Sequence, residues 1–187
     1  MGFTRDQLAR FAGKTVDDLL SPRVRLLFVG INPGLWTAAT NTHFCHPSNR
    51  FYPALRAAGL IDWGVDTSVG MSEEEKLRLV EAGIGITNLV PRATVRASEL
   101  GREELREGAE RLRRVVSEFR PAVVAVAGLT AYRAGFDRPG AVLGLQPETI
   151  GGAQLWVVPN PSGLNAHETI ESLAGWYRKA ADAAGLS

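Results

Sequence analysis

The sequence has little cysteine, no long apolar run and almost no net charge. Its single cysteine, Cys45, excludes an internal disulfide and any zinc or iron–sulfur site built mainly from thiolates. No apolar run approaches the ~20 residues that a membrane-spanning helix needs. The N-terminus mixes charged and apolar residues within its first turns, unlike a secretory signal. We therefore expect a cytoplasmic protein with no membrane partner.

Acidic residues are absent from one long stretch of the chain. Between Val24 and Ile61 there is no Asp or Glu, although Arg25, Arg50 and Arg56 lie within it. The overall net charge of +1 argues neither for nor against nucleic acid. The uneven distribution would give one face a positive potential suited to phosphates, whereas scattered, solvated arginines are the alternative interpretation.

Short apolar runs alternate with amphipathic stretches, which is typical of an α/β domain. Four runs are apolar almost throughout, as strands buried on both faces should be: Val24–Val29, Ile84–Leu89, Ala122–Ala127 and Leu155–Val158. The length suits one domain, and there is no internal repeat. The sequence predicts a single domain over residues 1–187, folded as a three-layer sandwich with a mostly parallel central sheet flanked by helices.

Amphipathic stretches predict helices between these strands. Thr4 with Gln7 and Ser72 with Glu75 are candidate capping boxes, and Asn49 is a candidate cap. The first 20 residues are expected to form an N-terminal helical extension. The predicted helices are Thr4–Leu20, Arg50–Ala58, Glu73–Glu81, Glu103–Phe119 and Glu168–Ala184.

Glycine, asparagine or proline follows each predicted strand, and two of these loops carry most of the candidate functional residues. The first begins GINPG at Gly30, and the second reads PNPSGLNAHE from Pro159. In open α/β sheets, ligands bind in the crevice at the carboxyl ends of the strands. We therefore expect the two loops to line one cleft, although they lie far apart in the sequence.

Each loop contains residues that admit a functional and a purely structural interpretation. Asn32 offers an amide that donates and accepts hydrogen bonds, or it caps the following helix. Leu164 is an apolar residue at the tip of a polar loop, where it either opens a DNA base step as a wedge or folds back onto the sheet. Asn165 with Glu168 resembles a capping pair, which would turn the positive end of the last helix toward the cleft.

Together the two loops resemble those of the mismatch-specific uracil/thymine DNA glycosylase family, which includes the bacterial mismatch uracil DNA glycosylase. The resemblance rests on GINPG and HPSNRF, between Gly30 and Phe51, and on NPSGLN in the second loop. It extends through GITNLV, RATV, GLTAY and GLQ in consistent order, from about Asp18 to about Tyr177. It implies a uracil-DNA glycosylase-like fold and a repair enzyme that flips uracil out of a G:U mismatch and hydrolyses its N-glycosidic bond.

The resemblance also implies roles for individual residues. Asn32 would be the catalytic residue that positions the attacking water, since an amide cannot be a strong general base. Phe44 would be an aromatic platform for the extruded base, and Leu164 would fill the space left in the stack. The implied base pocket comprises Gly30, Ile31, Thr37, Phe44, Asn88 and Asn160. The implied wedge and opposite-strand contacts are Gly163, Leu164 and Asn165.

Four positions bear on specificity. The Thr37 methyl group should crowd the methyl group of thymine, so uracil is expected to be preferred and thymine to be cleaved weakly. Asn88 either holds the flipped nucleotide or bonds the backbone of its own turn. Asn165–Ala166 stands where the bacterial enzyme has Ser–Arg. The arginine contact to the opposite strand is therefore missing, which should weaken dependence on a guanine partner.

The resemblance implies no cofactor and no metal, because His43 and His46 have no apparent third ligand. The expected partner is double-stranded DNA that contains G:U or related mismatches, bound by a monomer associated with the nucleoid. Alternatives are a glycosylase for hypoxanthine or exocyclic cytosine adducts, a non-catalytic phosphate- or nucleotide-binding domain, and an inactive DNA-binding relative. Neither GxGxxG nor GxxxxGK[ST] follows a strand, which disfavours the nucleotide binder. The presence of Asn32, Phe44 and Leu164 disfavours the inactive relative.

Overall fold

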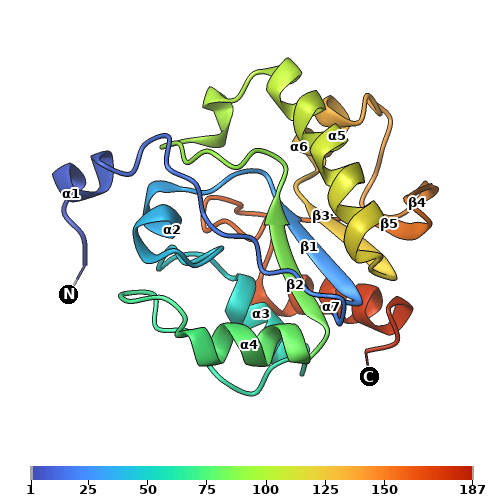
Figure 1. Cartoon of the computed structure of the whole chain (residues 1–187), viewed down its shortest axis with the longest axis horizontal. Coiled ribbons are helices and arrows are strands. Elements are labelled where there is room, and N and C mark those ends of the chain that lie inside the picture. Colours follow the sequence, from blue (N-terminus) through green and yellow to red (C-terminus); the bar gives the residue numbers. More distant parts are fainter. Residues whose placement is uncertain (1, 187) are drawn as a thin grey trace.

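A five-stranded sheet lies at the centre of the computed structural model, which describes residues 2–186 (Figure 1). The strand order is β2-β1-β3-β5-β4. The first four strands in this order run parallel, and β4 pairs antiparallel with β5. The bounds are β1 Leu26–Gly30, β2 Ile84–Asn88, β3 Val123–Ala127, β4 Gly144–Ile150 and β5 Ala153–Val158. The predicted mostly parallel sheet is confirmed.

Helices cover both faces of the sheet, so the predicted three-layer architecture is also confirmed. Successive side chains of a strand point to opposite faces. Phe28 accordingly packs into a core with α3 (Phe51–Ala57), α4 (Glu73–Glu81) and α7 (Ile170–Ala183). Its neighbour Val29 packs into a second core with α5 (Arg102–Phe119) and α6 (Leu129–Gly135). No helix among residues 2–186 is long and apolar enough to cross a membrane.

The predicted caps are confirmed at two helices and wrong at two others. Capping boxes form at Thr4 with Gln7 and at Ser72 with Glu75. The N-cap of α3 is Arg50, without a side-chain cap, and the predicted cap Asn49 lies one residue earlier, where its side chain accepts a hydrogen bond of 2.9 Å from the Phe51 N–H. Helix α7, however, begins at Ile170, and its capping box is formed by Thr169 and Ser172 instead of Asn165 and Glu168. Asn165 instead closes its own loop, because its Nδ2 donates to the Asn160 carbonyl at 3.0 Å.

The helix predicted over Thr4–Leu20 is wrong beyond its first turns. Helix α1 spans only Arg5–Ala9, and Gly13 adopts a φ of 76°. The chain then runs in an extended course along the outer edge of β2, where Leu19 and Ile86 exchange two backbone hydrogen bonds of 2.9 and 3.0 Å. The unpaired edge of β2 offers backbone partners that a surface helix would not reach. We call residues 13–19 the N-terminal strap.

The edge strand β4 and two short helices, α2 (Leu35–Thr40) and α6, are absent from the sequence-based prediction. Strand β4 contains Pro147 and exposes every second side chain near its start, so it lacks the continuous apolar pattern of the inner strands. Gly151 and Gly152 join it to β5, both with positive φ (54° and 85°). Such a glycine pair favours a tight hairpin, and it is the signal from which this strand could have been predicted.

Candidate active site

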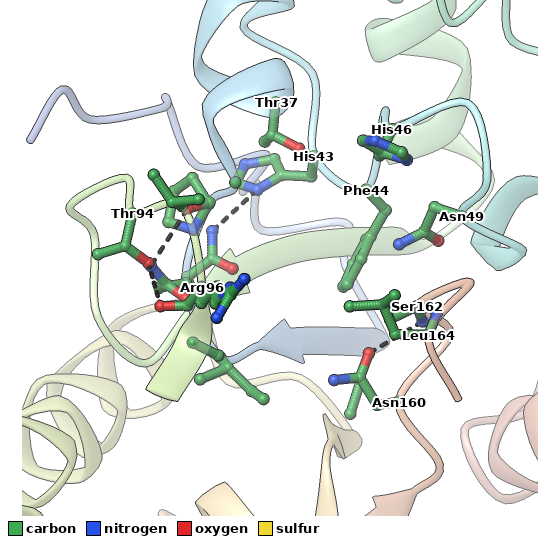
Figure 2. A pocket seen from close by; sticks show the side chains of 18 of the residues that line it. Thr37, His43, Phe44, His46, Asn49, Thr94, Arg96, Asn160, Ser162 and Leu164 are labelled. Carbon is green, nitrogen blue, oxygen red and sulfur yellow. Dashed lines mark hydrogen bonds between the residues drawn. The ribbon is translucent and has the colours of Figure 1, made fainter. Parts of the chain in front are cut away.

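A cleft of about 660 Å³ lies at the carboxyl ends of the strands. The loops after β1, β2 and β5 line it, which confirms that the two distant loops share one cleft. Figure 2 shows Thr94 and Arg96 on one side of it and Asn160, Ser162 and Leu164 on the other. The predicted site residues that line it are Ile31, Asn32, Thr37, Phe44, Asn88, Asn160, Leu164 and Asn165. Gly30 and Gly163 lie behind this lining, against Asn88 and Ser48.

The Asn32 amide is held in one orientation. Its Nδ2 donates to the carbonyl oxygens of Pro33 (3.2 Å) and Arg92 (3.0 Å) and to Thr94 Oγ1 (2.8 Å). A carbonyl oxygen can only accept a hydrogen bond, so the amide nitrogen must face this side. The Asn32 oxygen is thereby left as an acceptor at the cleft. Asn32 does not cap α2, whose N-cap is Gly34.

Thr94 completes this arrangement and has no role in the sequence-based prediction. Its hydroxyl donates to the Arg96 carbonyl at 2.8 Å and therefore presents a lone pair to the Asn32 amide. The Thr94 N–H also donates to the Pro33 carbonyl at 3.1 Å, which joins the loops after β1 and β2. Thr94 lies in the RATV segment, but nothing in that segment indicates its bond to Asn32.

The inner wall of the cleft is formed where Gly30, Phe44 and Asn88 meet. A Cβ atom at residue 30 would overlap Asn88 Oδ1 and lie 3.2 Å from Phe44 Cζ, so only glycine leaves both groups in place. Phe44 has a φ of 56°, a strained value for a residue with a side chain. Its ring stacks on Phe51, with centroids 4.2 Å apart. This contact fixes the aromatic face in the cleft.

Asn88 bonds a histidine and not the backbone of its own turn. Its Nδ2 lies 3.1 Å from Nδ1 of His43, whose Nε2 lies 2.7 Å from the Asp17 carbonyl of the strap. Burial lowers the pKa of His43 below its ordinary value, more strongly than the bond to Asp17 raises it. His43 is therefore neutral near pH 7.

The loop after β5 is anchored to the HPSNRF segment by hydrogen bonds of Arg50. Arg50 Nη1 donates to the carbonyl oxygens of Asn165 (2.9 Å) and Glu168 (2.8 Å), and the Arg50 N–H donates to the Pro161 carbonyl at 2.9 Å. A Cβ atom at residue 163 would lie 2.5 Å from Ser48 Oγ, so glycine permits the two loops to touch. The structural role of Arg50 was not predicted.

Leu164 stands at the tip of this anchored loop and is 93% exposed. It does not fold back onto the sheet. Exposure of a large apolar side chain to water is unfavourable unless a partner covers it. The position of Leu164 on the cleft rim is therefore suited to insertion into another molecule.

The cleft contains no carboxylate. Within the described range, residues 2–186, its lining includes the basic side chain of Arg96 and two histidines, but neither Asp nor Glu. A polyanion can therefore approach without facing fixed negative charge in the lining. The groups that this lining offers for chemistry are positioned amides and hydroxyls, two histidines and Arg96.

Comparison with known proteins identifies the family. A sequence model of the uracil DNA glycosylase superfamily matches residues 18–181, most of the chain. The chain belongs to this superfamily. It is a DNA glycosylase, a hydrolase that acts on DNA.

The fold of this glycosylase is also similar to a solved structure. A Methanosarcina acetivorans protein, provisionally assigned as a uracil DNA glycosylase, superimposes with a TM-score of 0.57. Identity is 18%, and the match covers 90% of this chain and 98% of that chain. At this level of identity the likeness concerns the fold. The glycosylase therefore combines a superfamily fold with a cleft built from a fixed amide, an aromatic ring and an exposed leucine.

Proposed function

We propose that the protein is a monofunctional, mismatch-specific uracil-DNA glycosylase, which flips uracil out of a G:U mismatch and leaves an abasic site. The proposal rests above all on the Asn32 amide. Its nitrogen is held by three acceptors, so its oxygen faces the cleft as a fixed acceptor. An oriented acceptor can align a water molecule for attack on C1′ of the deoxyribose.

The cleavage step does not need a general base of high strength. Water attacks C1′, the C1′–N1 bond breaks, and the bonding electron pair leaves with the pyrimidine as its anion. The water oxygen, now bonded to C1′, loses one proton to solvent and becomes the C1′ hydroxyl group, and the pyrimidine anion takes up a proton from solvent. Asn32 Oδ1 accepts a hydrogen bond from the water and holds its lone pair toward C1′. The absence of carboxylates from the lining within residues 2–186 agrees with such a mechanism. Placement of the reactants then supplies most of the acceleration.

Base extrusion is assigned to the second loop. A mismatched base costs a few kcal/mol to unstack, less than a base in a Watson–Crick pair. Leu164 is exposed on a loop that Arg50 holds in place. Leu164 would enter the vacated space in the duplex while the extruded uracil stacks on Phe44, and such stacking is worth ~1–3 kcal/mol.

Two residues bear on the lesion range. Thr37 lines the cleft and is only 5% exposed, so its methyl group would crowd a substituent on carbon 5 of the pyrimidine. Uracil would then be preferred over thymine. The Asn165 side chain is occupied within its own loop by the Asn160 carbonyl and the His167 N–H. It would therefore hold an opposing guanine only weakly.

Cleavage of defined duplexes tests the proposal. The substrates carry uracil opposite guanine or adenine, thymine opposite guanine, hypoxanthine, or an exocyclic cytosine adduct. Wild type should cleave uracil opposite guanine fastest. Asn32→Ala should lose about 100-fold or more of this rate while binding of the duplex persists.

Gln154→Ala is the matched control, since this exposed amide at the start of β5 lies outside the cleft. It should cleave at the wild-type rate. Equal cleavage by wild type and Asn32→Ala would remove Asn32 from the mechanism. Faster cleavage of hypoxanthine or of the adduct than of uracil would overturn the substrate assignment.

A further inference from the structure

The His43 ring bridges the N-terminal strap and the wall of the cleft. Its side chain is buried, with a residue exposure of 2%. Nε2 lies 2.7 Å from the Asp17 carbonyl, and Nδ1 lies 3.1 Å from Asn88 Nδ2. A carbonyl oxygen only accepts, so the ring proton must be on Nε2. In the neutral ring, Nδ1 then carries a lone pair and accepts from the Asn88 amide.

This bond determines which end of the Asn88 amide faces the cleft. With the nitrogen turned toward His43, Oδ1 lies over Gly30 and beside the Phe44 ring. The opposite orientation would place a carbonyl oxygen against the lone pair of Nδ1, which is repulsive. A single proton position on His43 therefore makes Asn88 a hydrogen-bond acceptor toward any base that stacks on Phe44.

The strap is itself anchored to the strand that carries Asn88. Asp18 pairs with Arg111 at 2.5 Å and accepts from Thr87 Oγ1 at 2.8 Å. Arg111 Nη1 donates to the Asn88 carbonyl at 2.9 Å. One guanidinium group thus fixes both the strap that holds His43 and the backbone of Asn88. The position of the ring between them is set by the fold.

The surroundings of His43 favour its neutral form. Asp17 and Asp18 of the strap raise its pKa, Lys76 of α4 lowers it, and loss of hydration on burial is the largest effect. From α3, the Tyr52 hydroxyl donates to the backbone carbonyl of His43 at 2.7 Å and leaves the ring nitrogens free for their other partners.

We infer that His43, held by the main chain of the strap, is a positioning residue that makes Asn88 select uracil over cytosine. The inference rests on the proposed function. Uracil carries an N–H at position 3, which can donate to Asn88 Oδ1. Cytosine carries a lone pair at the same position, which would face that oxygen without a proton between them. The discrimination between the two bases is thus set by a histidine in the wall of the cleft that need not touch the substrate.

A matched pair of substrates isolates this effect. 5-Fluorouracil and 5-fluorocytosine, each opposite the same abasic-site analogue in one duplex so that neither base has a pairing partner, share the substituent at carbon 5 and differ at positions 3 and 4. Single-turnover cleavage by wild type should favour 5-fluorouracil strongly. In His43→Phe, the Asn88 amide loses the group that orients it. Cleavage of 5-fluorouracil should fall about 10- to 100-fold, and the ratio between the two substrates should fall with it.

His43→Gln is the conservative variant. Its side-chain N–H can donate to the Asp17 carbonyl while its oxygen accepts from Asn88, so it should restore much of the ratio. The double variant His43→Phe with Asn88→Ala should match Asn88→Ala alone, because both changes remove one interaction. In wild type the ratio should also fall in acid, since protonation of Nδ1 turns the Asn88 amide around. His43→Gln should show no such decline.

The outcomes separate the two proposals. If wild type cleaves neither fluorinated base nor uracil, the proposed function is wrong. If wild type cleaves uracil, but His43→Phe slows both fluorinated substrates equally and leaves their ratio unchanged, the role of His43 in selection is wrong. Additive losses in the double variant would contradict it as well. Folding of each variant is checked by its thermal unfolding transition.

Discussion

The loop after β1 and the loop after β5 face the same cleft but are held in opposite ways. In the first, the functional side chain itself is fixed, because the Asn32 amide nitrogen bonds three acceptors. In the second, the backbone is fixed by Arg50, while the Leu164 side chain is left free and 93% exposed. A group that must align a water molecule needs an immobile side chain. A group that must enter a base stack needs a rigid support and an accessible tip.

The largest effect is expected from a substitution in the inner wall of the cleft, where Gly30, Phe44 and Asn88 meet. Gly30→Ala places a Cβ atom against Asn88 Oδ1 and 3.2 Å from the Phe44 ring. The base site should be distorted, and uracil cleavage should fall about 100-fold or more on single-stranded and duplex DNA alike. Single-turnover cleavage of both substrates measures this. Gly101→Ala is the control, because its added Cβ meets no atom within 4 Å and the residue lies outside the cleft lining. Wild-type activity of Gly30→Ala would show that the wall formed by Asn88 and Phe44 does not bind the base.

The next effect tests the wedge. Leu164→Ala removes the group that is proposed to fill the stack, so duplex cleavage should fall about 10- to 50-fold. Cleavage of single-stranded uracil should change little, because no stack has to be opened. Comparison of kcat/KM on the two substrates measures the difference. Val142→Ala, which alters an exposed residue outside the cleft lining, should leave both values unchanged. An equal loss on single-stranded DNA would mean that Leu164 contacts the extruded base and does not fill the stack.

The smallest effect concerns stability in acid. The pKa of His43 is lowered in the folded protein, whereas in the unfolded chain it returns to about 6.5. The unfolded state therefore binds more protons below that pH. Stability should be complete above about pH 6.5 and decline as the pH falls, by no more than about 1.4 kcal/mol per pH unit for one proton.

Unfolding by urea between pH 7.5 and 5 measures this decline. His43→Gln should remove the part of this decline that is due to His43, so its free energy of unfolding should vary less with pH than that of wild type. A wild-type curve that coincides with that of His43→Gln would mean that the ring is protonated as readily in the folded as in the unfolded state.

Local sequence patterns were sufficient to predict the four inner strands and the shared cleft of the loops after β1 and β5. Buried parallel strands have continuous apolar runs, and their carboxyl ends share one edge of the sheet. The strap was predicted as a helix, because local pattern does not reveal that the edge of β2 is open to pairing. For the site, the sequence predicted which residues line the cleft but not the side chains that hold them in place. Thr94 and His43 were missed as partners of Asn32 and Asn88, because 62 and 45 positions separate the bonded side chains.

The N-terminal strap also bears on whether strands of two copies of the protein can pair at the edge of the sheet. A sheet edge with free N–H and C=O groups invites a strand from another copy. At the β2 edge, Leu19 occupies the hydrogen-bonding groups of Ile86, and an isolated antiparallel bridge joins Thr15 to Arg92 nearby. At the opposite edge, β4 carries Pro147, which has no N–H to offer. The segment that holds His43 in place thus also occupies backbone groups of β2 with which a strand of another copy would pair.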